Sequence, residues 1–139
     1  MALNFKKVTY SDLNARQKEN YNYQKLSAVL AEYGFTTHRL TDDWQGADFI
    51  AQHLDGETFM KVQLKGRMCF FKKYIGKDIY IAFRAKSGEW YLYDHDKVLD
   101  QVIGKGNGIE KTSSWAVKGG YSFPSIKNEY LQILTPYKL

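Results

Sequence analysis

Apolar and polar residues alternate along residues 46–65, whose sequence is GADFIAQHLDGETFMKVQLK. Alternation with a period of two is typical of strands that bury one face. Asp55-Gly56, in the middle of the segment, is a dipeptide that favours a two-residue turn with positive φ. The pattern therefore predicts a β-hairpin that turns at these two residues.

The position of this turn determines which residues face one another across the predicted hairpin. Asp48 lies directly opposite Gln63, and Gly46 lies opposite Lys65. Because side chains alternate between the two faces of a strand, Asp48, Gln63 and Lys65 share one face. A carboxylate, an amide and an ammonium group at one end of a hairpin can hold a divalent metal ion beside a phosphate. The other face is apolar and would enter the core: Ala47, Phe49, Ala51, Met60, Val62 and Leu64.

Apolar residues at helical spacing precede the hairpin. They predict a helix that begins after a cap at Ser11 or Asp12 and ends near Tyr33. Gly34 follows as a residue suited to the position just beyond a helix C-terminus. The buried stripe of this helix would consist of Tyr23, Leu26, Val29, Leu30 and Tyr33.

Three further strands are expected around the hairpin. Residues 36–40 are predicted as a short edge strand, followed by a polar loop over residues 41–45. After the hairpin and a basic loop, residues 78–85 have the apolar content of a buried strand, and residues 89–93 return beside it.

The C-terminal part of the chain mixes helix and strand signals. Asp94 or Asp96 is suited to cap a helix that ends at Gly104, and residues 114–117 are predicted as a short strand. Ser125 is a candidate cap for a last element, for which the sequence allows helix or strand.

Length and composition predict one α/β or α+β domain over residues 1–139. No apolar run approaches the roughly 20 residues of a membrane span. The N-terminus lacks the apolar stretch of a signal peptide, and the single cysteine, Cys69, excludes an internal disulfide. These features favour a cytoplasmic protein without a membrane partner.

The formal net charge is +5, and the placement of the charges says more than their number. Residues 58–77 contain no acidic residue, and aromatic residues are interleaved with the basic ones. This pattern is typical of a surface for a phosphate backbone, although a solvated loop rich in lysine has the same composition. The basic residues of this segment are Lys61, Lys65, Arg67, Lys72, Lys73 and Lys77.

A helix, a short strand and a hairpin with this placement of polar residues resemble the PD-(D/E)xK nuclease superfamily, which includes archaeal Holliday junction resolvases and Mrr-type restriction enzymes. The matching sequences are GADFI at residues 46–50, QLK at residues 63–65 and LAEYGF at residues 30–35. The resemblance covers roughly residues 14–93. It implies the restriction-endonuclease-like fold, with a central mixed β-sheet flanked by helices.

The resemblance also implies hydrolysis of double-stranded or branched DNA with Mg²⁺ or Mn²⁺, by a protein that can act as a homodimer. Asp48 would be the central metal ligand, and the Gln63 side chain and the Leu64 backbone carbonyl would add oxygen ligands. Lys65 would orient the attacking water or stabilise charge on the phosphate, and Glu19 would supply a further carboxylate. The DNA backbone would be held by Lys61, Arg67, Lys72 and Lys73.

The chain departs from the family pattern in three places. Ala47 stands where the motif has proline, and Gln63 stands where most relatives have an acid. A neutral amide weakens metal affinity. The usual helix glutamate has no clear counterpart: Glu19 and Gln24 are the nearest candidates, and Asp43 is another carboxylate close to the hairpin.

Each of these interpretations has an alternative in which the residues have a purely structural role. Asp48 and Lys65 could form a plain surface ion pair. The DHD sequence at residues 94–96 predicts a helix cap with a solvated histidine rather than a metal site, and residues 115–121 favour a packed strand with a turn over a DNA contact. For the whole chain, the alternatives are an inactive nuclease-fold module that binds nucleic acid, or a protein-interaction domain, such as an inhibitor or immunity protein, with a tyrosine-rich surface.

Overall fold

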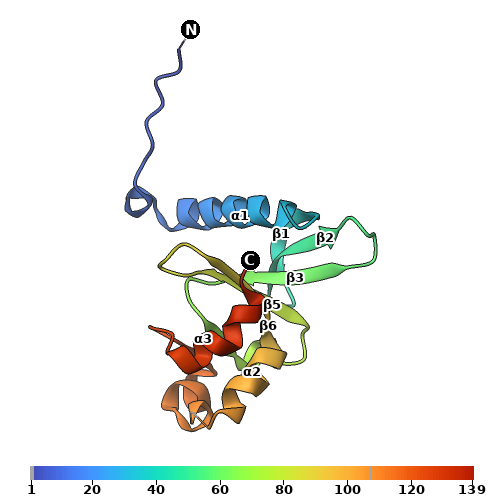
Figure 1. Ribbon diagram of the computed structural model, residues 1–139, viewed down its shortest axis with the longest axis vertical. Coiled ribbons are helices and arrows are strands. Elements are labelled where there is room, and N and C mark those ends of the chain that lie inside the picture. Colours follow the sequence, from blue (N-terminus) through green and yellow to red (C-terminus); the bar gives the residue numbers. More distant parts are fainter. Residues whose placement is uncertain (1, 107) are drawn as a thin grey trace.

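The computed structural model describes residues 2–106 and 108–139, and its centre is a five-stranded sheet with strand order β1-β2-β3-β5-β6. β3 and β5 are parallel, and the other neighbours are antiparallel. Helix α1 lies on one side of the sheet, and α2 and α3 lie on the other (Figure 1). This mixed sheet with flanking helices confirms the predicted α+β class. The bounds are α1 Ala15–Ala31, β1 Phe35–Trp44, β2 Ala47–His53, β3 Phe59–Leu64, β4 Cys69–Phe71, β5 Ile79–Arg84, β6 Trp90–Asp94, α2 His95–Gly104, β7 Gly120–Ser122 and α3 Asn128–Leu134.

β2 and β3 form the predicted hairpin in the predicted register. Phe49 faces Val62 and Gln52 faces Phe59 across the antiparallel pair. Asp48 precedes Phe49, and Gln63 follows Val62, so the carboxylate and the amide stand at the same end of the hairpin. The predicted apolar face is in the core, where four of its residues have no exposed surface: Ala47, Phe49, Ala51 and Val62.

The turn of this hairpin is wider than the two-residue turn predicted there. The His53 N–H donates to the Thr58 carbonyl, so four residues lie between the last hydrogen-bonded pair of the hairpin. A two-residue turn with positive φ instead joins β1 to β2, at Gln45 (φ 56°) and Gly46 (φ 90°). Gly46 belongs to that turn, and the predicted pairing of Gly46 with Lys65 is therefore wrong.

α1 begins later than predicted, because Asn14 rather than Ser11 or Asp12 is its cap. The Asn14 side chain accepts a hydrogen bond from the Gln17 N–H, and the Gln17 side chain accepts one from the Asn14 N–H. Tyr33, predicted in the buried stripe, is 51% exposed because it lies beyond the end of the helix. The buried cluster between α1 and the sheet consists of Leu26, Leu30, Phe49, Ala51, Val62, Ala82 and Trp90.

The edge strand β1 is longer than predicted. Gly34 adopts a φ of 85° just beyond α1, as expected of a residue that ends a helix. The strand then continues through residues 41–44, which were predicted as loop, with an irregularity of register between Arg39 and Trp44. This bulged part of β1 lies beside the start of β2.

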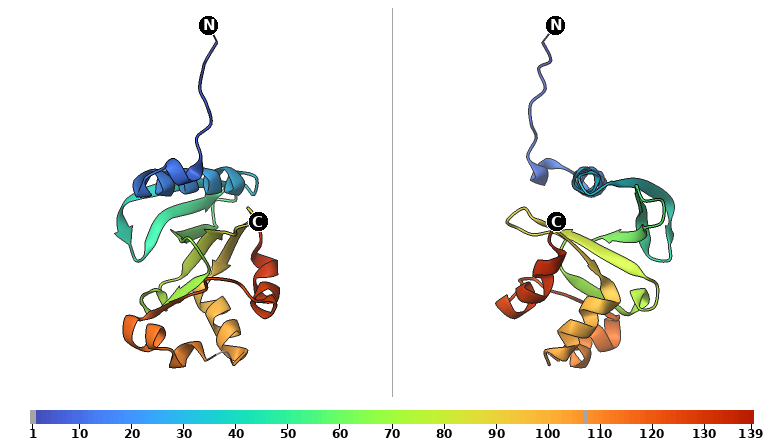
Figure 2. Two further views of the ribbon diagram at one scale, coloured as in Figure 1. Left: turned by 90° about the vertical axis from the view of Figure 1, so that its left-hand side faces the viewer. Right: turned by 45° about the vertical axis from the view of Figure 1, so that its right-hand side comes forward.

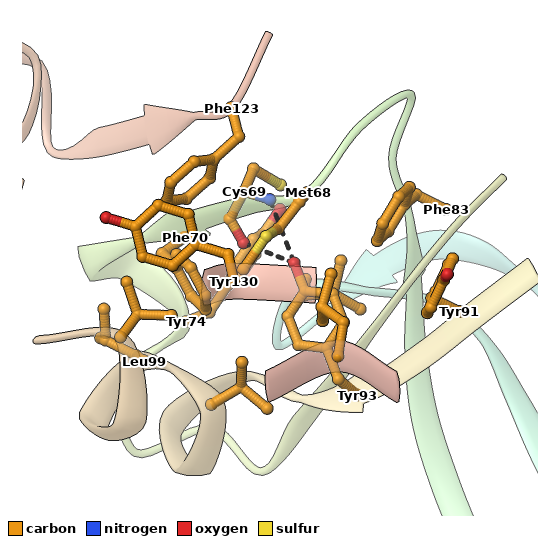
Figure 3. Packing of buried hydrophobic residues seen from close by; sticks show 14 of the residues in the cluster. Met68, Cys69, Phe70, Tyr74, Phe83, Tyr91, Tyr93, Leu99, Phe123 and Tyr130 are labelled. Atoms are coloured by element: carbon orange, nitrogen blue, oxygen red, sulfur yellow. Dashed lines mark hydrogen bonds between the residues drawn. The ribbon is translucent and has the colours of Figure 1, made fainter. Parts of the chain in front are cut away.

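The segment predicted as a basic loop contributes to the core of the molecule. It forms β4, which pairs with β7, and it buries Met68, Cys69 and Phe70. The Tyr93 hydroxyl donates to the Cys69 carbonyl (2.7 Å) and accepts from the Cys69 N–H (3.0 Å), as Figure 3 shows. The aromatic and sulfur side chains thus face inward, while the lysines that follow them are exposed.

His95 is buried, which corrects the prediction of a solvated side chain. Asp94 caps α2 as predicted, but the imidazole of His95 has no exposed surface. Its Nε2 accepts from the Phe71 N–H (3.0 Å), which leaves the proton on Nδ1 to be donated to Asp96 Oδ1 (2.8 Å). Burial lowers the pKa of His95 below its ordinary value, against the opposing effect of Asp96.

The C-terminal part differs from its prediction in local structure. Ser114–Lys118 forms a single π-helical turn instead of a strand, and Trp115 is packed in the core, its N–H donating to Thr112 Oγ1. The last element is a helix, α3, which begins after Lys127 rather than at a Ser125 cap.

Residues 2–9 leave the body of the molecule as an extended segment (Figure 2). Within residues 2–106 and 108–139, no helix has the length and apolar character needed to span a membrane.

Candidate metal and nucleic-acid cleft

A cleft of about 1160 Å³ lies where β2 begins and β3 ends. Its walls are the N-terminal half of α1, the bulged part of β1 and the turn that joins β5 to β6. Segments distant in sequence therefore meet at the polar end of the hairpin. Six of the residues considered for metal or catalytic chemistry line this cleft: Glu19, Asp43, Asp48, Gln63, Leu64 and Lys65. Gln24, the other candidate on the helix, is exposed and lies outside the lining.

Asp48 is half-buried in the cleft, and one of its carboxylate oxygens is fixed. Oδ2 accepts a hydrogen bond from the Leu64 N–H at 2.9 Å, which ties β2 to β3. Burial raises the pKa of Asp48 above its ordinary value, and the charges of Asp43 and Glu19 raise it further. The Leu64 hydrogen bond and the charge of Lys65 act in the opposite direction. Both candidate extra carboxylates are thus close enough to act on Asp48.

Gln63 and Leu64 carry the other predicted oxygen ligands. The Gln63 Nε2 donates a long hydrogen bond to the Leu64 carbonyl oxygen, at 3.4 Å. An ion on this carbonyl would compete with that bond, which is weak at this length. The amide and the carbonyl are therefore adjacent to each other, and the N–H of the same Leu64 contacts Asp48.

Lys65 contacts aromatic rings rather than a carboxylate. Its Nζ lies 4.7 Å from the ring centroid of Phe71 and 5.6 Å from that of Tyr74. Within residues 2–106 and 108–139, Lys65 forms no ion pair. The alternative interpretation, a surface ion pair between Asp48 and Lys65, is therefore wrong. The absence of a side chain at Gly46 leaves room for the Tyr74 ring, because a Cβ at Gly46 would come within 2.8 Å of that ring. The φ of Gly46, 90°, also favours glycine.

The oxygen atoms in the cleft are of the chemical types that bind a hard divalent cation. Mg²⁺ takes oxygen ligands and commonly uses one or two carboxylates together with water and phosphate oxygens. Asp48 offers a carboxylate with one oxygen already positioned, and an amide and a backbone carbonyl lie beside it. Among the described residues, however, no group of three or more Asp, Glu, His or Cys side chains is close enough to hold a metal ion.

Comparisons with known proteins give one distant structural similarity. The chain is similar to Hjc, a Holliday junction resolvase from the archaeal hyperthermophile Archaeoglobus fulgidus, with a TM-score of 0.43 and 13% sequence identity. The similarity covers 54% of this chain and 76% of that chain. No protein-family model matches the chain, and no curated protein matches it. Any assignment of function rests on the cleft itself.

The four residues predicted to hold DNA lie outside the lining of the cleft. Arg67, Lys72 and Lys73 are exposed, and Lys61 donates from its Nζ to a backbone carbonyl. The Lys73 ammonium lies 5.2 Å from the ring centroid of Tyr74. Lys65, in the cleft, contacts the same ring. Lys73 therefore adjoins the cleft through this shared ring.

A different set of basic residues lines the cleft, and sequence reasoning missed it. Helical spacing provides one signal, since Arg16, Glu19 and Tyr23 are three and four residues apart and share a face of α1. Arg39 of β1, Arg84 at the end of β5 and Lys86 in the turn that follows have no local signal, because only the folded sheet brings them here. The missed residues are Arg16, Lys18, Arg39, Arg84 and Lys86.

The basic side chains of the cleft are not neutralised by carboxylates. In the part of the chain that the structure describes, no Lys or Arg forms an ion pair with Asp or Glu, and the two ion pairs found there involve His53 and His95. Cations from both walls are thus available to a polyanion that enters the cleft.

Proposed function

We propose that this protein is a metal-dependent endonuclease that hydrolyses DNA phosphodiester bonds. The single observation that carries this proposal is the half-buried Asp48, with a raised pKa, in a cleft that also contains Glu19, Asp43 and Lys65. Burying a carboxylate away from ion pairs disfavours its charge, and a bound cation would restore the balance. The basic walls of the cleft supply attraction for a nucleic-acid backbone.

Asp48, Gln63 and the Leu64 carbonyl would hold the Mg²⁺ or Mn²⁺ ion, with Glu19 or Asp43 as the additional carboxylate. Such an ion polarises a phosphate and lowers the pKa of a water molecule. The hydrogen bond from the Leu64 N–H would keep Asp48 oriented. Gln63 would have to leave the Leu64 carbonyl for that oxygen to coordinate.

Lys65 would stabilise negative charge that develops on the scissile phosphate, or orient the attacking water. Its ammonium rests against Phe71 and Tyr74, which restrict the side chain without neutralising it. This arrangement favours a fixed cation over a flexible one.

Substrate and assembly are parts of the same proposal. Double-stranded or branched DNA would contact Lys61, Arg67, Lys72 and Lys73, and a homodimer would allow both strands to be cut. We further propose a cytoplasmic location and a single domain over residues 1–139.

Two observations favour a second candidate, an inactive nuclease-fold module that binds nucleic acid or a protein. Gln63 is neutral, and the described residues contain no cluster of three metal-binding side chains. DNA binding without manganese binding would favour the nucleic-acid module. Absence of DNA affinity at low salt would favour a protein partner.

The test is cleavage of supercoiled plasmid and of branched DNA with Mg²⁺ or Mn²⁺. We expect Asp48→Asn to lower the cleavage rate by about 10³-fold, because it removes the central ligand but keeps an acceptor for the Leu64 N–H. Asp100→Asn, an exposed acid on α2, is the matched control and should cleave like the wild type. Equal rates for Asp48→Asn and the wild type would refute the nuclease proposal.

A further inference from the structure

Two of the walls of the cleft, the N-terminal half of α1 and the turn that joins β5 to β6, belong to different parts of the chain. Figure 1 shows the turn between β5 and β6 beneath the N-terminal half of α1, and residues of both line the cleft. Its volume of about 1160 Å³ slightly exceeds the roughly 300–1,000 Å³ of pockets that enclose drug-sized ligands. A space of this size can enclose a short stretch of one nucleic-acid strand, whereas a duplex could only lie across its mouth.

Each wall of the cleft presents an arginine that is held in place. Arg39, on the β1 side, donates to the Asn20 side chain and lies 5.1 Å from the ring centroid of Tyr23. Arg84, on the opposite wall, donates from Nε to the Gly88 carbonyl at 3.0 Å. Guanidinium groups that are already ordered lose little entropy when they bind a phosphate. The two walls are thus prepared to hold a phosphate backbone between them.

Tyr10 adds a fixed aromatic ring to the lining of the cleft. Its hydroxyl accepts from Asn22 Nδ2 at 2.9 Å, its ring centroid lies 5.3 Å from that of Tyr21, and the Lys18 ammonium lies 5.3 Å from it. The side chain is nevertheless 43% exposed. Asn22 and Tyr21 hold this ring, and a base that takes the place of the Lys18 ammonium over it can stack there, which contributes about 1–3 kcal/mol per base.

We propose that the cleft binds a single-stranded nucleic-acid segment, with a base stacked on Tyr10 and the backbone between Arg39 and Arg84, leading to Asp48. An enclosed cleft, cations on both walls and an open aromatic ring are the features that single strands use. The link to Asp48 rests on the proposed function, because the strand bound here would be the one cleaved. Binding itself requires no metal and no hydrolysis.

The test is fluorescence anisotropy in EDTA with a labelled DNA oligonucleotide of about 12 nucleotides, alone or annealed to its complement. We expect the single strand to bind at least about tenfold more tightly than the duplex. Tyr10→Leu should raise the Kd for the single strand about tenfold through loss of base stacking. Tyr10→Phe keeps the ring and should remain within about threefold of the wild type.

Charge variants provide a second, independent readout. Arg84→Gln should weaken single-strand binding and reduce its salt dependence, whereas Lys127→Gln, at the start of α3 outside the cleft, should leave both unchanged. Duplex affinity equal to or above single-strand affinity would overturn the inference, as would an unchanged single-strand Kd in Tyr10→Leu and Arg84→Gln. Because these assays contain no metal, they separate this inference from the nuclease proposal: an inactive protein can still prefer single strands, and an active one can still prefer duplexes.

Discussion

A closed core and an open cleft lie at different places on the central sheet, and the difference locates the candidate site. On one face, α2, α3 and the β4–β7 pair enclose the larger core cluster, which is rich in aromatic rings. α1 covers a smaller cluster on the other face, and a charged cleft opens at the end of the sheet where β2 begins and β3 ends, beside the N-terminal half of α1. The closed core provides stability, and the cleft leaves polar groups accessible to a ligand.

Two titratable groups, the fully buried His95 and the half-buried Asp48, show the same difference. His95, on the closed face, has a protein partner for each ring nitrogen and is held neutral. Asp48, in the cleft, has one positioned oxygen and a raised pKa, with further carboxylates nearby. The histidine is part of a completed hydrogen-bond network, whereas the carboxylate retains capacity for a cation.

The largest expected effect on stability distinguishes two phenylalanines of equal burial. Phe70 and Phe49 both have no exposed surface. Phe70 contacts the rings of Tyr93, His95 and Phe123, while Phe49 contacts the ring of Tyr23. We expect Phe70→Ala to lower the free energy of unfolding by about 3–5 kcal/mol, and by more than Phe49→Ala. Urea denaturation measures both, and an equal or larger loss for Phe49→Ala would break the contrast between the faces.

A smaller effect is expected at His95. His95→Leu leaves the Phe71 N–H without its acceptor and should cost about 1–3 kcal/mol at neutral pH. Because the folded pKa of His95 lies below the unfolded value of 6.5, the unfolded chain binds the extra proton. Wild-type stability should therefore fall as the pH drops below about 6.5, and this part of the decline should be absent in His95→Leu. Thermal denaturation across this pH range provides the check; parallel curves for the two proteins would contradict a buried neutral histidine.

The smallest effect is a gain of stability in the cleft. The pKa of Asp48 is raised above the unfolded value of 3.8, so its ionised form is disfavoured in the folded protein. Asp48→Asn should raise the Tm by a few degrees at neutral pH, and the gain should vanish as the pH falls below the unfolded value. Calorimetric scans at neutral and acidic pH test this, with Asp100→Asn as the control. A lower Tm for Asp48→Asn at neutral pH would show that Asp48 supports the fold.

Local patterns explain which parts of the fold could be predicted. The register of β2 and β3 follows from alternation around one turn, and it held even though the turn is wider, because the centre of the turn is unchanged. The cap at Asp94 is likewise a short-range feature. Predictions failed where pairing is long-range: β4 pairs with β7, and His95 is buried because the Phe71 N–H approaches it from that segment.

The residues of the candidate site also divide into those that local patterns predict and those that only long-range pairing brings together. The hairpin register predicts that Asp48, Gln63 and Lys65 lie at one end of the hairpin, and all three line the cleft. The prediction that Glu19 or Asp43 lies near them required only a helix and a loop adjacent to the hairpin, and the cleft contains both. Arg84, by contrast, reaches the cleft through the parallel pairing of β3 with β5, which no local pattern reveals.

The most direct test of the metal centre is a crystal structure of the wild-type protein soaked in millimolar Mn²⁺, with anomalous scattering used to locate the ion. We expect an anomalous peak bonded to the Asp48 carboxylate, with Gln63 or the Leu64 carbonyl as a neighbouring ligand, and no such peak in Asp48→Asn. A well-ordered cleft without a peak at Asp48, or the same peak in Asp48→Asn, would contradict the proposed metal centre.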